Sequence, residues 1–135
     1  KKMPDAKLEG VMIEQMAGKG QEVIVGMRRD LGFGPVMMFG LGGIYVELFK
    51  DVAFRVAHLS DEEALEMIHE THAGRLLTGF RGGPKADLQA VVSCIRRLSQ
   101  IAMDFPEIEE AEVNPLLVFP EGQGALVLDG RIIKK

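Results

Sequence analysis

The spacing of apolar residues changes at Ser60, and this change constrains the fold more than any other feature of the sequence. Before Ser60, apolar residues form short runs with strand-like alternation, separated by glycine-rich turns. From there to about Met103 they recur every three or four residues, as in amphipathic helices. Strand-like sequence then returns. This order predicts an α+β fold, with a mostly antiparallel sheet and helices packed on one face.

The sequence before Ser60 predicts several strands. Residues 11–16 and 22–28 are expected to form a hairpin, and residues 36–39 the next strand. Extended segments are expected around residues 44–49 and 52–57. All of these strands precede the first helix.

Two helices are predicted in the middle of the chain. Ser60 and Glu63 form a capping-box pattern that begins a helix over residues 61–72, and a short helical turn is expected at 75–77. A longer helix is expected from Asp87 to Met103. Its sheet-facing stripe would consist of Leu88, Val91, Val92, Ile95, Leu98 and Ala102.

Composition argues against several kinds of partner. The chain has 135 residues, which fits a single domain over 1–135, and its net charge of −4 without a basic patch argues against nucleic acid as the main partner. No apolar run approaches the ~18 residues needed to span a bilayer, so no membrane partner is expected. The one cysteine, Cys94, lies among aliphatic residues and is expected to be a buried structural thiol in a reducing cytoplasm.

Oxygen-bearing side chains gather in the stretch EAEVNPLLVFPEGQGALVLD, residues 110–129. On a strand, Glu110, Glu112 and Asn114 point to one face. Pro115 is expected to stop regular pairing, and a hairpin closing near residues 121–122 would place Asn114 opposite Asp129. Carboxylate and carboxamide oxygens suit Mg²⁺ that is shared with substrate phosphates.

Other segments are weaker candidates for ligand contact. Glycines at 40–43 can bring backbone amides close to an anion, but a simple bend between strands explains them equally well. Arg28 and its neighbour Arg29 are candidates for phosphate contact. The alternative is that they are solvated side chains at the end of a strand. Glu22 is a candidate for a ribose contact, or an exposed glutamate at a sheet edge. Arg81 is a candidate for binding a phosphate, or an ordinary surface loop residue. No catalytic triad, Cys-His pair or histidine metal spacing is evident.

Four segments, taken in order, resemble the ATP-grasp region of NDP-forming acyl-CoA synthetases. They read IEQMAGKGQEVIVGMRRDLGFGPVMMFGLGGIYVELFKDVAFRVAHLSDEEA, LLTGFRGGPKAD, EIEEAEVNPLLV and GALVLDGRI, and they extend over residues 10–133. The likeness is greatest to the ATP-grasp (beta) subunit or domain of ADP-forming acetyl-CoA synthetases. It implies the C-terminal subdomain of an ATP-grasp fold.

The resemblance implies the nucleotide end of a reversible ligase reaction. Acyl-CoA, ADP and phosphate would give acid, CoA and ATP through a phosphohistidine relay, with ATP/ADP and Mg²⁺ held here and a CoA-binding alpha subunit or domain as partner. By motif, Glu112, Asn114 and Asp129 are implied metal ligands. The implied nucleotide contacts are Glu14, Gln15 and Met16 near adenine, Glu22 near ribose, Gly42 and Gly43 near the phosphates, and Arg28 and Arg81 as phosphate-site or loop contacts.

One departure from the family pattern limits these expectations. The upstream ATP-grasp subdomain, with its phosphate-binding lysines, is missing, and no histidine here matches the relay residue. We therefore expect the chain alone to be catalytically silent and to bind nucleotide weakly, and the unpaired face predicts self-association into a homo-oligomer. Alternatives are a regulatory ATP-grasp module of a protein lysine acetyltransferase, and a structural subunit. The acyl substrate is not assigned.

Overall fold

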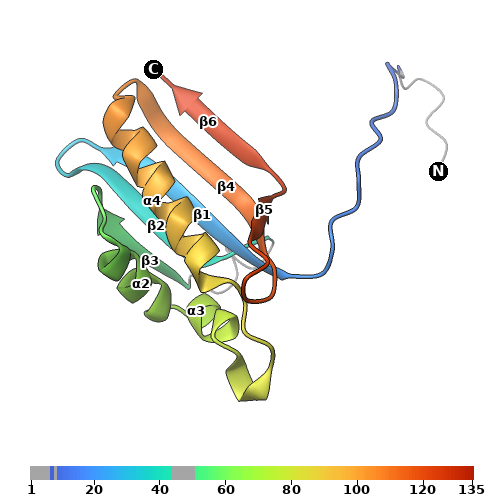
Figure 1. The fold of residues 1–135 in the computed structure, drawn as a ribbon. Helices are drawn as coiled ribbons and strands as arrows, with labels where there is room; N and C mark the ends of the chain where they lie inside the picture. The colour runs from blue at the N-terminus through green and yellow to red at the C-terminus, as the bar shows by residue number, and fades with distance from the viewer. Residues whose placement is uncertain (1–6, 8, 44–50) are drawn as a thin grey trace.

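A single antiparallel sheet carries the helices on one of its faces (Figure 1). The computed structural model describes residues 7, 9–43 and 51–135. Within them the six strands run in the order β3-β2-β1-β4-β5, with β6 also pairing with β4. The elements are β1 (Gln21–Asp30), β2 (Gly34–Leu41), β3 (Val52–Val56), α2 (Asp61–His69), α3 (His72–Leu77), the 3-10 turn η1 (Phe80–Gly82), α4 (Leu88–Asp104), β4 (Ile108–Val118), β5 (Ala125–Val127) and β6 (Gly130–Lys134). The predicted fold class is confirmed.

The core lies between the sheet and the helices. Alternate residues of β1 and β2 face the helices and are almost fully buried. Each such side chain contributes roughly 1.5–3 kcal/mol of burial free energy. The opposite face of the sheet carries no described helix (Figure 1). The core-facing residues of these two strands are Val23, Val25, Met27, Met37 and Phe39.

The helix predicted over residues 61–72 ends at His69, and the helical turn predicted at 75–77 is part of a second helix that begins at His72. The capping box is present: the Ser60 hydroxyl accepts from the Glu63 amide at 3.2 Å, and the Glu63 carboxylate accepts from the Ser60 amide at 2.8 Å. The first helix, α2, ends at His69 because Thr71 begins the next one. The buried Thr71 hydroxyl accepts from the Gly74 amide at 3.0 Å and donates to the carbonyl of α2 at 2.8 Å. One side chain thus ends α2 and caps α3.

The long helix α4 forms where the sequence predicts it. The Asp87 carboxylate caps it by accepting from the Ala90 amide at 3.1 Å, and its second oxygen accepts from the Gly124 amide at 2.8 Å. The start of α4 is therefore tied to the turn between β4 and β5. The predicted stripe faces the sheet, with all its members buried except Leu88, which is half-buried. None of the described helices is long and apolar enough to cross a membrane.

The strand predicted at residues 11–16 is not formed. Val11, Met12, Ile13 and Met16 are 83–91% exposed, and their segment extends away from the sheet (Figure 1). The expected hairpin fails because β1 already pairs on one edge with β2 and on the other with β4. The extended segment predicted around 44–49 lies outside the described residues, whereas the one at 52–57 forms β3.

Pro115 interrupts regular pairing, as expected, but β4 does not end there. The strand continues through it because Pro115 lies in a bulge, where β4 has one more residue than β1. Val25 pairs with Val113 and Val23 with Leu116, so two residues of β4 oppose one of β1. On its other edge β4 pairs with β6 before the proline and with β5 after it.

Arg29 fixes the carboxyl end of α4. Its Nη2 donates to the Ala102 carbonyl at 2.7 Å and, at 3.4 Å, to that of Phe105, while its Nε donates to the Ile108 carbonyl at 3.1 Å. A cation at the negative end of a helix is favourable. Arg29 is therefore a structural residue and not a phosphate ligand, whereas its neighbour Arg28 points to the opposite face of the sheet.

Replacing Arg29 with alanine is expected to lower the free energy of unfolding by about 1.5–3 kcal/mol, because backbone carbonyls lose a charged donor. Arg28→Ala is the matched control, since it removes the same side chain one residue away and should leave stability nearly unchanged. Urea unfolding of both variants checks this. Equal losses for the two variants would contradict the role given to Arg29.

Candidate functional site: an oxygen-rich group on the open sheet face

Asn114 of β4 lies opposite Asp129, which immediately precedes β6, as the sequence predicts. The Asn114 amide donates to the Asp129 carbonyl at 3.1 Å, immediately before the first residue pair of β4 and β6. The Asp129 carboxylate accepts from the Gly130 amide at 2.8 Å. The bulge at Pro115 sets this arrangement, because it returns Leu116 to the core after Val113 while Asn114 is directed away from it.

The side chains of Glu112 and Asn114 are hydrogen-bonded to each other. Asn114 Nδ2 donates to Glu112 Oε1 at 3.3 Å, and Asn114 Oδ1 accepts from the Gly43 amide at 3.0 Å. Both ends of the Asn114 carboxamide are therefore engaged. The predicted ligand strand is thus connected to the predicted glycine turn, 71 residues earlier in the chain.

The glycine turn packs directly on β1. The Gly42 amide donates to the Glu22 carbonyl at 3.1 Å, and a Cβ at Gly42 would lie 2.7 Å from the Val23 carbonyl carbon. Gly43 has φ 65°, in the left-handed region, and a Cβ there would lie 2.9 Å from the Glu22 carboxylate. Glu22, the two glycines and Asn114 therefore form one site. We call Glu22, Gly42, Gly43, Glu112, Asn114 and Asp129 the oxygen group.

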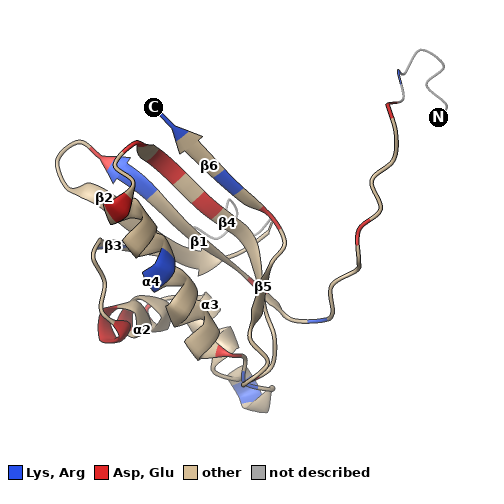
Figure 2. Ribbon diagram, turned by 45° about the horizontal axis from the view of Figure 1, so that its top comes forward, with Lys and Arg blue, Asp and Glu red and all other residues tan. Residues whose placement is uncertain are grey.

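Arg131, which sequence reasoning missed, is the basic neighbour of this group. It pairs with Glu112 across β4 and β6; its guanidinium contacts the Glu110 carboxylate and lies 3.4 Å from Glu112 Oε2. Figure 2 shows acidic bands on β4 beside a basic band on β6. The sequence did contain a signal for Arg131, because this residue lies two positions after Asp129, on the strand expected to pair with β4.

A shallow groove of about 690 Å³ extends from the acidic side chains along the same face. Arg28 lines it together with Glu110 and Glu112, while Met38 and Phe54 supply apolar walls. Arg28 is thus placed beside the acidic part of the site. The groove combines apolar surface with opposite charges at one edge.

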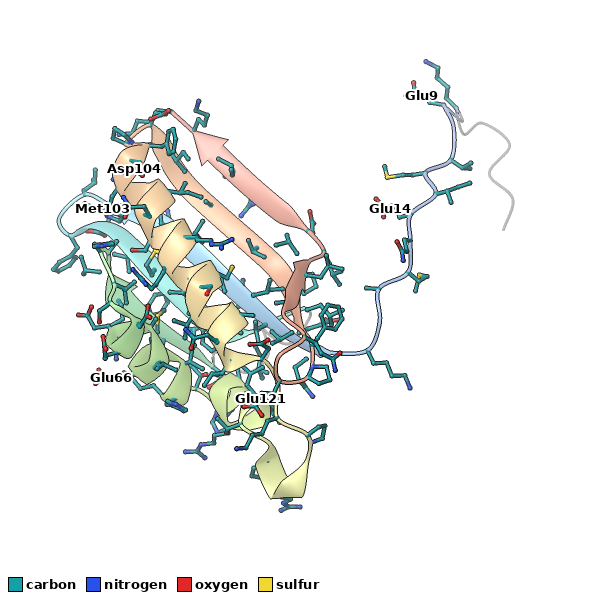
Figure 3. All side chains as sticks on the ribbon, in the orientation of Figure 1. Glu9, Glu14, Glu66, Met103, Asp104 and Glu121 are labelled. Atoms are coloured by element: carbon teal, nitrogen blue, oxygen red, sulfur yellow. The ribbon has the colours of Figure 1, made fainter. Side chains whose placement is uncertain are left out.

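Four of the predicted nucleotide contacts lie elsewhere. Glu14, Gln15 and Met16 belong to the exposed N-terminal segment, and Figure 3 shows Glu14 well away from the sheet. Arg81 lies in the loop at η1 with φ 54°, its guanidinium 5.3 Å from the Phe80 ring centre. In the described part of the chain, no hydrogen bond or ion pair connects these residues with the oxygen group.

The donor set fits a hard divalent cation that also has other ligands. Among the described residues, no three His, Cys, Asp or Glu side chains lie close enough together to hold a metal alone. Glu112, Asn114 and Asp129 offer two carboxylates and one carboxamide, all oxygen donors. Mg²⁺ usually takes one or two protein carboxylates and fills its remaining positions with water and phosphate oxygens. The residues therefore fit a shared Mg²⁺ site and not a complete protein cage.

Two titratable groups outside the oxygen group, Cys94 and Asp51, have structural roles. Burial raises the pKa of the Cys94 thiol, which argues against a nucleophile and agrees with the expected structural role. Burial also opposes ionisation of Asp51, but hydrogen bonds from His72 and from the Ala73 amide outweigh it and keep the pKa of Asp51 below its ordinary value. Asp51 thus caps α3.

Known proteins are similar to this chain in sequence. The family model described as an ATP-grasp domain matches residues 1–133. The beta subunit of ADP-forming acetate–CoA ligase I from Pyrococcus furiosus is 47% identical over 130 residues, covering 96% of this chain and 55% of that subunit. ADP-forming acetate–CoA ligase I from Archaeoglobus fulgidus is 46% identical over 132 residues, covering 98% of this chain and 19% of that protein.

A solved structure is similar to this chain in both fold and sequence. Dinucleotide-forming acetyl-coenzyme A synthetase 1 from Ca. Korarchaeum cryptofilum, in complex with coenzyme A and Mg-AMPPCP, matches with a TM-score of 0.83 and 47% identity. The match covers 88% of this chain and 55% of that one. The chain belongs to the ATP-grasp family, and it spans about half the length of the beta subunit it matches.

Gly42→Ala should lower the free energy of unfolding by about 1–3 kcal/mol, because the added Cβ overlaps the backbone of β1. Gly32→Ala is the matched control, since its Cβ would meet nothing closer than 3.4 Å. Denaturant unfolding measures the loss of stability, and the backbone amide NMR signal of Gly43 reports whether the turn has moved. Equal stability of the two variants would show that the turn is not packed as described.

Proposed function

We propose that this chain forms the Mg-nucleotide side of an ADP-forming acyl-CoA synthetase active site, as part of a larger ligase. The observation that carries the proposal is the convergence of Glu22, the glycine turn and Asn114 through hydrogen bonds from three separate segments. Relatives of more than 40% identity support it, since their names describe ADP-forming acetate–CoA ligases.

In this proposal each part of the oxygen group has its own task. Asn114 presents its oxygen to the cation from β4 and Asp129 from the residue just before β6, and Glu112 adds a carboxylate. A bound Mg²⁺ would disperse charge on the nucleotide phosphates during phosphoryl transfer. The Gly42–Gly43 turn would lie beside the phosphates, with its two amides already donating to the Glu22 carbonyl and to Asn114 Oδ1, and the Glu22 carboxylate accepts from ribose hydroxyls. Arg28 then neutralises phosphate charge from the neighbouring groove.

The remaining contacts would come from outside the described sheet. Glu14, Gln15 and Met16 would meet adenine through their backbone when the segment lies against an upstream ATP-grasp subdomain, and Arg81 would contact a neighbouring loop. A CoA-binding alpha subunit or domain would carry out acyl transfer and supply the phosphohistidine. The beta-subunit names of the relatives support such a partner. The single partly buried thiol suits a cytoplasmic setting.

The proposal predicts Mg²⁺-dependent nucleotide binding by the chain once an upstream ATP-grasp subdomain is joined to it. Asn114→Ala and Asp129→Ala should each weaken Mg-ATP binding by at least about tenfold, judged from the loss caused even by indirect metal contacts. Calorimetric titration with Mg-ATP, and with ATP plus chelator, separates the metal-dependent part. The chain alone should bind weakly and make neither ATP nor acetyl-CoA.

Asp104→Ala provides a matched control, because it removes a carboxylate at the end of α4 on the helix-bearing face. It should bind Mg-ATP like the unchanged protein. If Asn114→Ala and Asp129→Ala also bind normally, the metal assignment is wrong. If the 135-residue chain alone catalyses at a normal enzymatic rate, the half-site interpretation is wrong.

A further inference from the structure

We propose that Arg131 is a positioning residue for Asn114 and acts through the carboxylate of Glu112. The inference rests on the proposed Mg-nucleotide function, and it concerns a residue to which neither the motifs nor the relatives assign a role. Arg131 itself need not touch the cation or the nucleotide. Its task is to fix which atom of the Asn114 carboxamide faces the site.

The contacts form a continuous chain across three segments. The Arg131 guanidinium, held also by Glu110, lies 3.4 Å from Glu112 Oε2. The other oxygen, Oε1, accepts from Asn114 Nδ2 at 3.3 Å, and Asn114 Oδ1 accepts from the Gly43 amide at 3.0 Å. Arg131 thus reaches the glycine turn through two intervening side chains.

The orientation of the carboxamide decides whether Asn114 can bind a cation. Its carbonyl oxygen is a ligand, but its NH₂ group carries two donors and repels a cation. A carboxylate beside Nδ2 favours the orientation in which NH₂ faces Glu112 and Oδ1 faces Gly43. If Glu112 were free to rotate, this preference would weaken. Arg131 holds Glu112 by charge from β6 and so favours the ligating orientation.

Simple electrostatics predicts the opposite effect of removing Arg131. Its positive charge, close to Glu112, should disfavour a nearby cation, so neutralising it should tighten Mg²⁺ binding. The positioning role predicts weaker binding instead. The sign of the change therefore separates a positioning residue from a bystander charge.

The first test uses the 135-residue chain without metal or nucleotide. Asn114 is the only asparagine in the sequence, so labelling with ¹⁵N-asparagine gives one side-chain amide signal. Arg131→Gln should move this signal toward that of a solvated asparagine, and Arg131→Lys should restore it largely. Lys134→Gln is the matched control, because it removes an equally exposed charge from the same strand, paired with Glu107 at 3.8 Å. The control should leave the signal in place.

The second test measures Mg²⁺ dependence in the chain joined to an upstream ATP-grasp subdomain. Arg131→Gln should weaken Mg-ATP binding by about tenfold, with little change in metal-free ATP binding. Arg131→Lys should recover most of the loss, and Lys134→Gln should show none. Unchanged or tighter Mg-ATP binding by Arg131→Gln, or an unmoved Asn114 signal, overturns the positioning role.

The two tests distinguish failure of this inference from failure of the proposed function. If the unchanged protein shows no Mg²⁺-dependent nucleotide binding, the proposed function fails, and the Asn114 signal still decides whether Arg131 orients the carboxamide. If the unchanged protein binds Mg-ATP but Arg131→Gln binds it equally well, only the positioning role fails.

Discussion

The structure depends on the position of β1 between β2 and β4. Both edges of β1 are paired, and its core-facing residues are covered by the helices. Its other face is only partly exposed, because Glu22 and Arg28 are exposed there whereas Ile24, between them, is 2% exposed. Glu22 and Arg28 lie toward the two ends of that face, and the other members of the oxygen group belong to the glycine turn, to β4 and to the residue just before β6. The strand order thus determines where ligand contacts can occur.

A bulge in β4 reconciles packing with ligand presentation. Without an extra residue, regular alternation would send either Leu116 or Asn114 to the wrong face. The bulge at Asn114 and Pro115 lets Val113 and Leu116 both contact the core while Asn114 joins Glu112. Pro115 is suited to this place because it lacks an amide donor. The proline that was expected to stop regular pairing does so by forming this bulge.

Local signals predicted much of the fold, and non-local pairing explains what they missed. The Ser60 capping box, the α4 stripe and the pairing of Asn114 with Asp129 each depend on residues close in sequence or on one hairpin. The failed strand at 11–16 depended on whether β1 had a free edge, which β4 decides from about 90 residues away. The structural role of Arg29, and Arg131 altogether, were missed for the same reason, since their partners lie on other elements. The ligand contacts assigned to all of the predicted site residues stay predictions, those of Glu14, Gln15, Met16 and Arg81 included.

The arrangement of charges explains how an acidic site is stable before a cation binds. Glu110 and Glu112 lie on one face of β4, where their mutual repulsion would destabilise the fold. Arg131 contacts both carboxylates and offsets this repulsion. In the proposed site a cation would therefore share Glu112 with a guanidinium. Asn114 and Asp129 do not pair with a basic side chain in the described residues, and they remain the stronger donors in the proposed site.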